Sequence, residues 1–200
     1  MLYLSQYTLS FTEARELRLT DGYSVHRVVY GLFKDVRGGN TQEHSGILFA
    51  DKGCKDRKRR LWILSNRLPR EVEKGELASK DLPLEYLQFA HYDFEVVVNP
   101  VRRDNQNGKM VPLRDREAVA QWFCAKAPSW GFAVHESSLL VADMAVDAFH
   151  KGGGLVTLGK ATLTGSLHVT DREAFIASVS NGIGKGRAFG CGLLQIIPKQ

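Results

Sequence analysis

Short strand-like segments and helix-like segments alternate along this chain, in an order that occurs twice. In the first half, strands are expected at residues 1–10, 46–51, 60–66 and 92–98, with an amphipathic helix at about 21–34. Asn99-Pro100 ends the last of these strands, because proline donates no hydrogen bond to a sheet. Residues 67–90 have a mixed composition that leaves room for one short helix.

The second half repeats this order. A helix is expected at about 115–127, where Pro128 stops it, and the apolar segments at about 131–148 and 154–169 form a hairpin. A second helix follows Thr170 and ends near residue 180, and residues 193–197 form the closing strand. Each half is therefore approximately βαββ(α)β, which predicts an α+β fold of two tandem ferredoxin-like, or RRM-like, domains at residues 1–99 and 100–200.

Composition excludes several classes of protein. The 200 residues contain no run of 18 apolar residues, so no membrane-spanning helix is expected, and the N-terminus lacks the basic and apolar regions of a signal peptide. Three widely spaced cysteines form no zinc pattern and favour a reducing, cytoplasmic location. The net charge of +5 and the pI of about 9.2 favour nucleic acid only slightly.

The helix expected at 21–34 has two distinct faces. One face carries the apolar stripe Val25, Val28, Val29, Leu32 and Phe33. The opposite face carries Tyr23, His26, Arg27 and Tyr30. These four residues are either ordinary surface side chains or a site that binds and cleaves RNA, since histidine exchanges protons near neutral pH and arginine neutralises phosphate.

Two further segments allow two interpretations each. Residues 181–192 hold five glycines together with Lys185 and Arg187, and form either a packed loop between helix and sheet or a cradle for a nucleic-acid backbone. Residues 52–60 hold six cations and one acid between two apolar runs. This segment is either a solvated hairpin tip or an arm that contacts phosphates. We find no metal-binding motif, so any phosphodiester chemistry would use side chains alone.

Three stretches of the sequence resemble the CasE family, the endoribonucleases that process CRISPR repeats in type I-E systems. The first is the helix with Tyr23, His26 and Arg27, and the second is Val98-Asn99-Pro100, followed by a cationic turn and Gly108-Lys109-Met-Val-Pro-Leu113. The third and most specific is Asn181-Gly-Ile-Gly-Lys-Gly-Arg-Ala-Phe-Gly-Cys-Gly-Leu-Leu194. The resemblance extends over nearly the whole chain, and these three stretches carry it.

The resemblance implies a metal-independent endoribonuclease without a cofactor. It would bind the hairpin of a CRISPR precursor RNA and cut once at the 3′ base of the stem. The products would carry a 2′,3′-cyclic phosphate and a 5′-hydroxyl, and the mature guide RNA would be retained. The implied partners are the precursor RNA hairpin and the other subunits of the type I-E surveillance (Cascade) complex, with no membrane.

The resemblance also implies roles for individual residues. His26 would be the catalytic histidine, as base or as acid, and Tyr23 its companion. The residues expected to bind RNA are Arg27, Arg102, Arg103, Lys109, Lys151, Lys160, Lys185 and Arg187. Two alternatives remain from the sequence: a non-catalytic RNA-binding module of the same fold, and a ferredoxin-like small-molecule enzyme or protein-interaction domain, which would not explain the glycine-rich loop beside cations.

Overall fold

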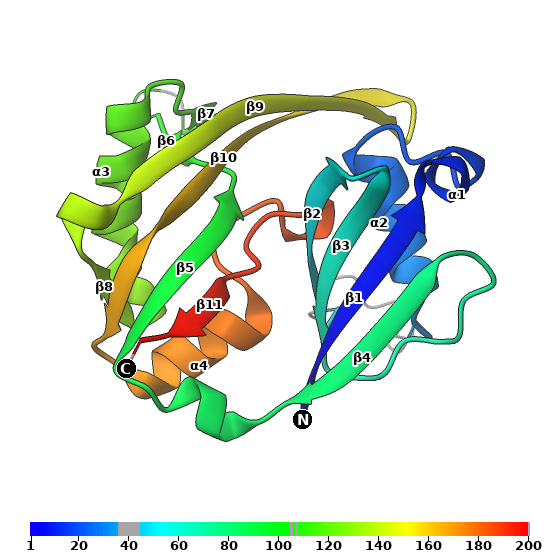
Figure 1. Cartoon of the computed structure of the whole chain (residues 1–200). Coiled ribbons are helices and arrows are strands. Elements are labelled where there is room, and N and C mark those ends of the chain that lie inside the picture. Colours follow the sequence, from blue (N-terminus) through cyan, green and yellow to red (C-terminus); the bar gives the residue numbers. More distant parts are fainter. Residues whose placement is uncertain (36–44, 105, 107, 200) are drawn as a thin grey trace.

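The first sheet of the protein has four antiparallel strands in the order β2-β3-β1-β4. The computed structural model describes residues 1–35, 45–104, 106 and 108–199. The strands are β1 (Leu2–Ser10), β2 (Ile47–Lys55), β3 (Lys58–Ser65) and β4 (Glu76–Leu82). Two helices, α1 (Phe11–Glu16) and α2 (Gly22–Gly31), complete this half (Figure 1). The apolar stripe predicted for α2 is confirmed, because Val25, Val29 and Phe33 are buried in one core with the inner faces of β1, β2 and β3.

The second sheet has the order β11-β5-β10-β8, and β9 extends it by pairing with β10. Its strands are β5 (His91–Val98), β8 (Phe132–Val134), β9 (Leu140–Lys151), β10 (Gly154–Val169) and β11 (Gln195–Pro198). Helices α3 (Arg116–Lys126) and α4 (Arg172–Asn181) pack on one face, where Phe123 and Phe175 enter a second core. The connections include the 3-10 turns η1 (Leu84–Leu87), η2 (Ala127–Trp130), η3 (Glu136–Ser138) and η4 (Arg187–Phe189).

Both halves have the strand order expected for a βαββαβ unit, and the predicted α+β class is confirmed. The predicted boundary between residues 99 and 100 is wrong by one strand, because β5 pairs with β10 and β11 of the second sheet. The chain therefore changes sheets between β4 and β5. The fourth strand of the first sheet is β4, which we did not predict: it is an edge strand with mostly exposed polar residues and so shows no apolar alternation.

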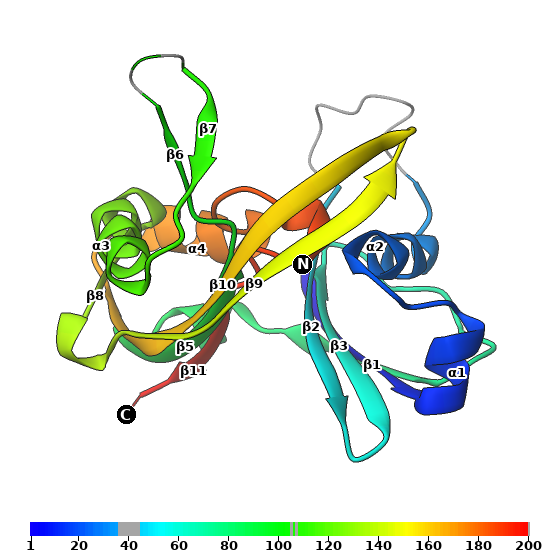
Figure 2. The ribbon, with the colours of Figure 1, turned by 90° about the horizontal axis from the view of Figure 1, so that it is seen from above.

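Two hairpins extend from the second half. The longer one, β9–β10, reaches across the molecule to α2, as seen from above in Figure 2. The shorter one consists of β6 (Val101–Arg103) and β7 (Met110–Pro112) and projects on the same side of the molecule as the end of β9–β10. The β2–β3 hairpin points to the opposite side. Among the described residues, no helix has the length and apolar character needed to cross a membrane.

Candidate functional site

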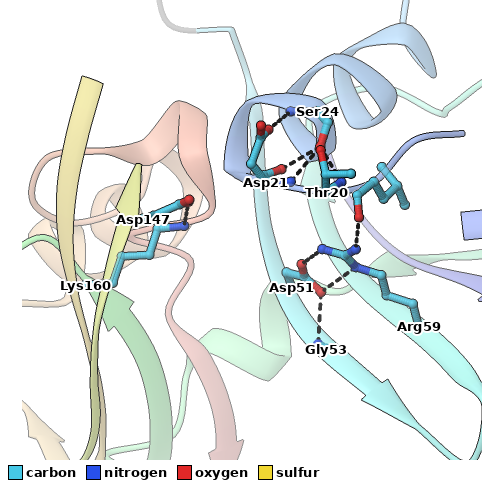
Figure 3. Close-up of polar contacts among 9 residues, drawn as sticks. Thr20, Asp21, Ser24, Asp51, Gly53, Arg59, Asp147 and Lys160 are labelled. Carbon is cyan, nitrogen blue, oxygen red and sulfur yellow. Dashed lines mark hydrogen bonds and ion pairs between the residues drawn. The ribbon is translucent and has the colours of Figure 1, made fainter. Parts of the chain in front are cut away.

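The N-terminus of helix α2 is fixed by a capping box. The side chain of Asp21 accepts a hydrogen bond from the backbone N–H of Ser24 at 2.7 Å, and the Ser24 hydroxyl accepts from the backbone N–H groups of Thr20 and Asp21. These contacts satisfy donors that a helix start otherwise leaves unpaired (Figure 3). With Val25 and Val29 in the core, the helix has one orientation, which turns His26 toward the second half of the molecule.

The imidazole of His26 meets the glycine-rich loop of the second half. Its Nδ1 lies 2.8 Å from the carbonyl oxygen of Ala188, which is 162 residues away in the sequence. A carbonyl oxygen can only accept, so Nδ1 carries the proton of this hydrogen bond. In the neutral ring, Nε2 is then the basic nitrogen.

Aromatic rings enclose His26. The ring centroid of Tyr30 lies 4.1 Å from that of His26, the ring of Phe189 lies at 5.7 Å, and the ring of Tyr23 is stacked at 6.0 Å. Phe149 of β9 stacks on Tyr23 at 6.0 Å and contacts Phe189 at 4.7 Å. The helix face predicted to be accessible is therefore half-buried between the two halves of the molecule, because β9 and the glycine-rich loop cover it.

Tyr30 is a neighbour of His26 that the sequence placed on this face without giving it a role. Its hydroxyl pairs with that of Ser45 at 3.0 Å, and its ring is the closest aromatic contact of His26. The spacing of four residues from His26 was the available signal, because residues four apart are neighbours on a helix. Arg27 is exposed, and its guanidinium lies 5.8 Å from the ring of Tyr23.

The glycine-rich loop packs tightly against the first half. Gly190 has φ +82° and approaches the buried ring of Phe49 so closely that a Cβ there would lie 3.1 Å from it. Arg187 donates to the carbonyl oxygen of Asn181 at 2.9 Å, whereas Lys185 is exposed. The loop is therefore packed, as one of the two interpretations expected. It also places Ala188 and Phe189 against His26. Its role as a nucleic-acid cradle stays a prediction.

The cations predicted to bind RNA lie in different surroundings. Lys151, at the tip of the β9–β10 hairpin, is exposed with its Nζ 5.5 Å from the ring of Phe189, next to the His26 site. Arg102 and Arg103 are exposed on β6, and Lys109 is exposed just before β7. Lys160 differs, since its Nζ is paired with the carboxylate of Asp147 at 2.9 Å and is only 20% exposed.

The cationic segment 52–60 forms the end of the β2–β3 hairpin, on the side of the molecule away from the β6–β7 hairpin (Figure 2). Lys52 pairs with Glu95, and Arg59 pairs with Asp51 and donates to the carbonyl oxygen of Leu19. Part of its positive charge is therefore neutralised within the protein. Across the described part of the chain, no three histidine, cysteine or acidic side chains gather in a group that could hold a metal ion.

Comparisons with known proteins agree with this fold. A sequence model of a family described as CRISPR associated protein matches residues 2–198. A relative from Thermus thermophilus, the CRISPR-associated endoribonuclease Cse3, is 27% identical over 115 residues. That alignment includes 52% of this chain and 54% of the relative, so it spans about half the length of the relative.

Two solved structures extend the similarity over the whole chain. One is Thermus thermophilus Cse3 bound to an RNA representing a pre-cleavage complex, with a TM-score of 0.82, 19% identity and coverage of 98% of this chain and 99% of that chain. The other is a chain of a CRISPR RNA-guided surveillance complex in a pre-nicking state, with a TM-score of 0.70, 20% identity and coverage of 98% and 100%. These similarities confirm the predicted pair of tandem ferredoxin-like units.

Proposed function

The chain belongs to the CRISPR associated protein family, and from that premise we propose that it is an endoribonuclease that processes CRISPR repeat RNA. The similarity to a CRISPR-associated endoribonuclease and the fold shared with an RNA-bound Cse3 support this assignment. We further propose that it cuts once at the 3′ base of a repeat hairpin without a metal, and retains the mature guide RNA as a subunit of a surveillance complex.

The hydrogen bond between His26 and Ala188 is the observation that carries the proposed chemistry. It holds Nδ1 in the protonated form and orients the ring, so Nε2 is the nitrogen suited to accept a proton. Tyr23 and Tyr30 border the same imidazole, and their phenols can hydrogen-bond to a phosphate or orient a nucleotide. Lys151, beside Phe189, adds positive charge near the site.

In the proposed reaction, the substrate supplies its own nucleophile. Nε2 of His26 takes the proton of the ribose 2′-hydroxyl, and the 2′-oxygen attacks the adjacent phosphorus. The bond between phosphorus and the 5′-oxygen breaks, and that oxygen takes up a proton. The products carry a 2′,3′-cyclic phosphate and a 5′-hydroxyl, with no water consumed in this step.

Exposed cations are suited to hold the RNA stem. The predicted contacts Arg27, Arg102, Arg103, Lys109, Lys151 and Lys185 are all exposed. Side chains cannot easily read the deep major groove of A-form RNA, so recognition is expected to depend on stem shape and phosphates. Affinity should then fall steeply as the salt concentration rises. Arg187 and Lys160, which have partners within the protein, are weaker candidates for phosphate contacts.

Cleavage of a labelled repeat-hairpin RNA in EDTA tests the proposal. We expect the wild-type protein to release a 2′,3′-cyclic phosphate end, and His26→Ala to slow cleavage by about a hundredfold or more while binding is retained. The end group can be identified by its resistance to phosphatase until acid opens the cyclic ester.

Three results would contradict parts of this account. A requirement for a divalent metal would contradict the proposed mechanism, and normal cleavage by His26→Ala would make His26 structural. Binding without cleavage by the wild-type protein, across several repeat hairpins, would favour the alternative of a non-catalytic RNA-binding module.

A further inference from the structure

An ion pair on the β9–β10 hairpin lies against the start of helix α2. Lys160 Nζ of β10 donates to Asp147 Oδ2 of β9 at 2.9 Å, and the two side chains are 20% and 19% exposed (Figure 3). Burying two charges to this extent costs solvation free energy, which pairing offsets only when the geometry is good. Keeping the protein surface soluble would not require a pair of charges that is buried to this extent.

The ion pair approaches the backbone of Gly22, the first residue of α2. A Cβ atom at Gly22 would lie 2.2 Å from Asp147 Oδ2 and 3.4 Å from Lys160 Nζ. Only glycine permits this approach without moving the carboxylate. A negative charge at this end of a helix is favourable, because the first backbone N–H groups point toward it.

The surroundings of Lys160 are acidic. Beside Lys160, a cavity of about 300 Å³ has four acidic residues in its lining, Asp21, Asp51, Asp143 and Asp147. Arg59 is the other cation in this lining, and it is paired with Asp51. An RNA phosphate would meet more negative than positive charge here. This environment disfavours the RNA-binding role that the sequence predicted for Lys160.

We infer that Asp147 and Lys160 are positioning residues that hold the N-terminus of α2 against the β9–β10 hairpin and so place His26 opposite Ala188. His26 lies four positions after Gly22, which is about 6 Å along the axis of an α-helix. Two residues beyond Asp147, Phe149 stacks on Tyr23, so the hairpin contacts α2 at two points. The inference rests on the proposed function, because positioning matters only if His26 acts on RNA.

Asp147→Asn is the first test, with Asp143→Asn as the matched control. Both substitutions remove one negative charge from the same strand and the same cavity, but only Asp147 is the partner of Lys160. In single-turnover assays with a repeat-hairpin RNA, we expect Asp147→Asn to slow cleavage about ten- to a hundredfold, because small displacements of a catalytic group have effects of this size. The dissociation constant for an uncleavable 2′-deoxy RNA should be unchanged, and Asp143→Asn should match the wild type in both measurements.

Lys160 variants separate positioning from RNA binding. We expect Lys160→Met to slow cleavage while leaving the salt dependence of binding unchanged, whereas loss of a phosphate contact would lower the slope of log K against log salt by about 1. Lys160→Arg keeps the charge and should recover most of the cleavage rate. Gly22→Ala should also slow cleavage, because the new Cβ would displace the carboxylate of Asp147. Alanine is otherwise favourable in a helix, so helix formation itself should not suffer.

Hydrogen exchange measured without RNA tests the contact independently of activity. Amides in the first turns of α2 should exchange faster in Asp147→Asn than in the wild type or in Asp143→Asn. If Asp147→Asn matches Asp143→Asn in both exchange and cleavage, or if Lys160→Met weakens binding with a smaller salt slope, the inference is wrong. If the wild type does not cut, the proposed function fails, and the exchange data alone decide whether the pair positions α2.

Discussion

At the scale of single residues, one hydrogen bond determines which ring nitrogen of His26 carries a proton in the neutral form. A histidine on an exposed helix face could present either nitrogen, so the sequence alone leaves the tautomer open. The carbonyl of Ala188 removes this ambiguity by accepting from Nδ1. No spacing rule could have predicted that contact, since its partner lies in a loop near the other end of the chain.

Cysteine reactivity provides a test of loop packing at this scale. Cys191, in the glycine-rich loop, is fully buried, and burial raises the pKa of its thiol to about 11, whereas Cys54 is exposed. At pH 8 only about one thousandth of Cys191 would be thiolate, and thiolate is the reactive form. We expect iodoacetamide at pH 8 to label Cys54 in the native protein and to leave Cys191 unmodified, as read by peptide mass spectrometry. Rapid labelling of native Cys191 would mean that the loop is open.

The same raised pKa predicts how stability changes in alkaline solution. Between about pH 9 and pH 11, the unfolded chain loses the Cys191 proton that the folded protein keeps. The folded state then binds more protons, so the free energy of unfolding falls as the pH rises through this range. Urea unfolding of Cys191→Ala, compared with the wild type at pH 8 and pH 10.5, should show a smaller loss between the two values. Equal losses would contradict the assignment to Cys191.

At the scale of secondary-structure elements, the sequence predicted those helices and strands that have one buried face, because burial requires apolar residues at a regular spacing. The stripe on α2 and the alternation in β5 identify those elements, because each has one face in a core. β4 was missed because its residues are mostly exposed, and β5 was then assigned to the first sheet in its place. Helix α1 was also missed, although Ser10 and Glu13 form a capping box that was visible in the sequence.

Two cationic hairpins should differ in their contribution to RNA binding. The exposed Arg102 and Arg103 of β6 lie on a hairpin that projects on the side where the tip of β9–β10 and Lys151 lie, whereas the tip of β2–β3 points away (Figure 2). We expect Arg102→Ala and Arg103→Ala each to weaken binding of the repeat hairpin and to lower the salt slope by about 1. Arg57→Ala, at the tip of β2–β3, is the control of equal charge and should leave the slope unchanged. A larger effect of Arg57→Ala would identify the β2–β3 hairpin as the RNA-binding arm.

At the scale of the whole molecule, the site exists only where the two halves meet. Helix α2 supplies His26 and its tyrosines, β9 supplies Phe149, and the loop before β11 supplies Ala188 and Phe189. Sequence periodicity describes each element by itself and does not say which elements meet. The resemblance to the CasE family brought Tyr23, His26 and the glycine-rich loop into one hypothesis, but the closeness of Tyr30 and the pairing of Lys160 with Asp147 required the structure.

A pair of glycine substitutions tests whether packing between the two halves of the molecule sets the position of Ala188 relative to His26. Gly190 and Gly184 lie in the same loop with φ +82° and +68°, so alanine at either position should cost about 1 to 2 kcal/mol of backbone strain. Only at Gly190 would the new Cβ press on Phe49 of the first half, since a Cβ at Gly184 has nothing within 4 Å. We therefore expect Gly190→Ala to lower the urea midpoint further than Gly184→Ala does, and to slow RNA cleavage as Ala188 moves away from His26. If the two variants unfold and cleave alike, the close packing of the loop on β2 does not set the geometry of His26.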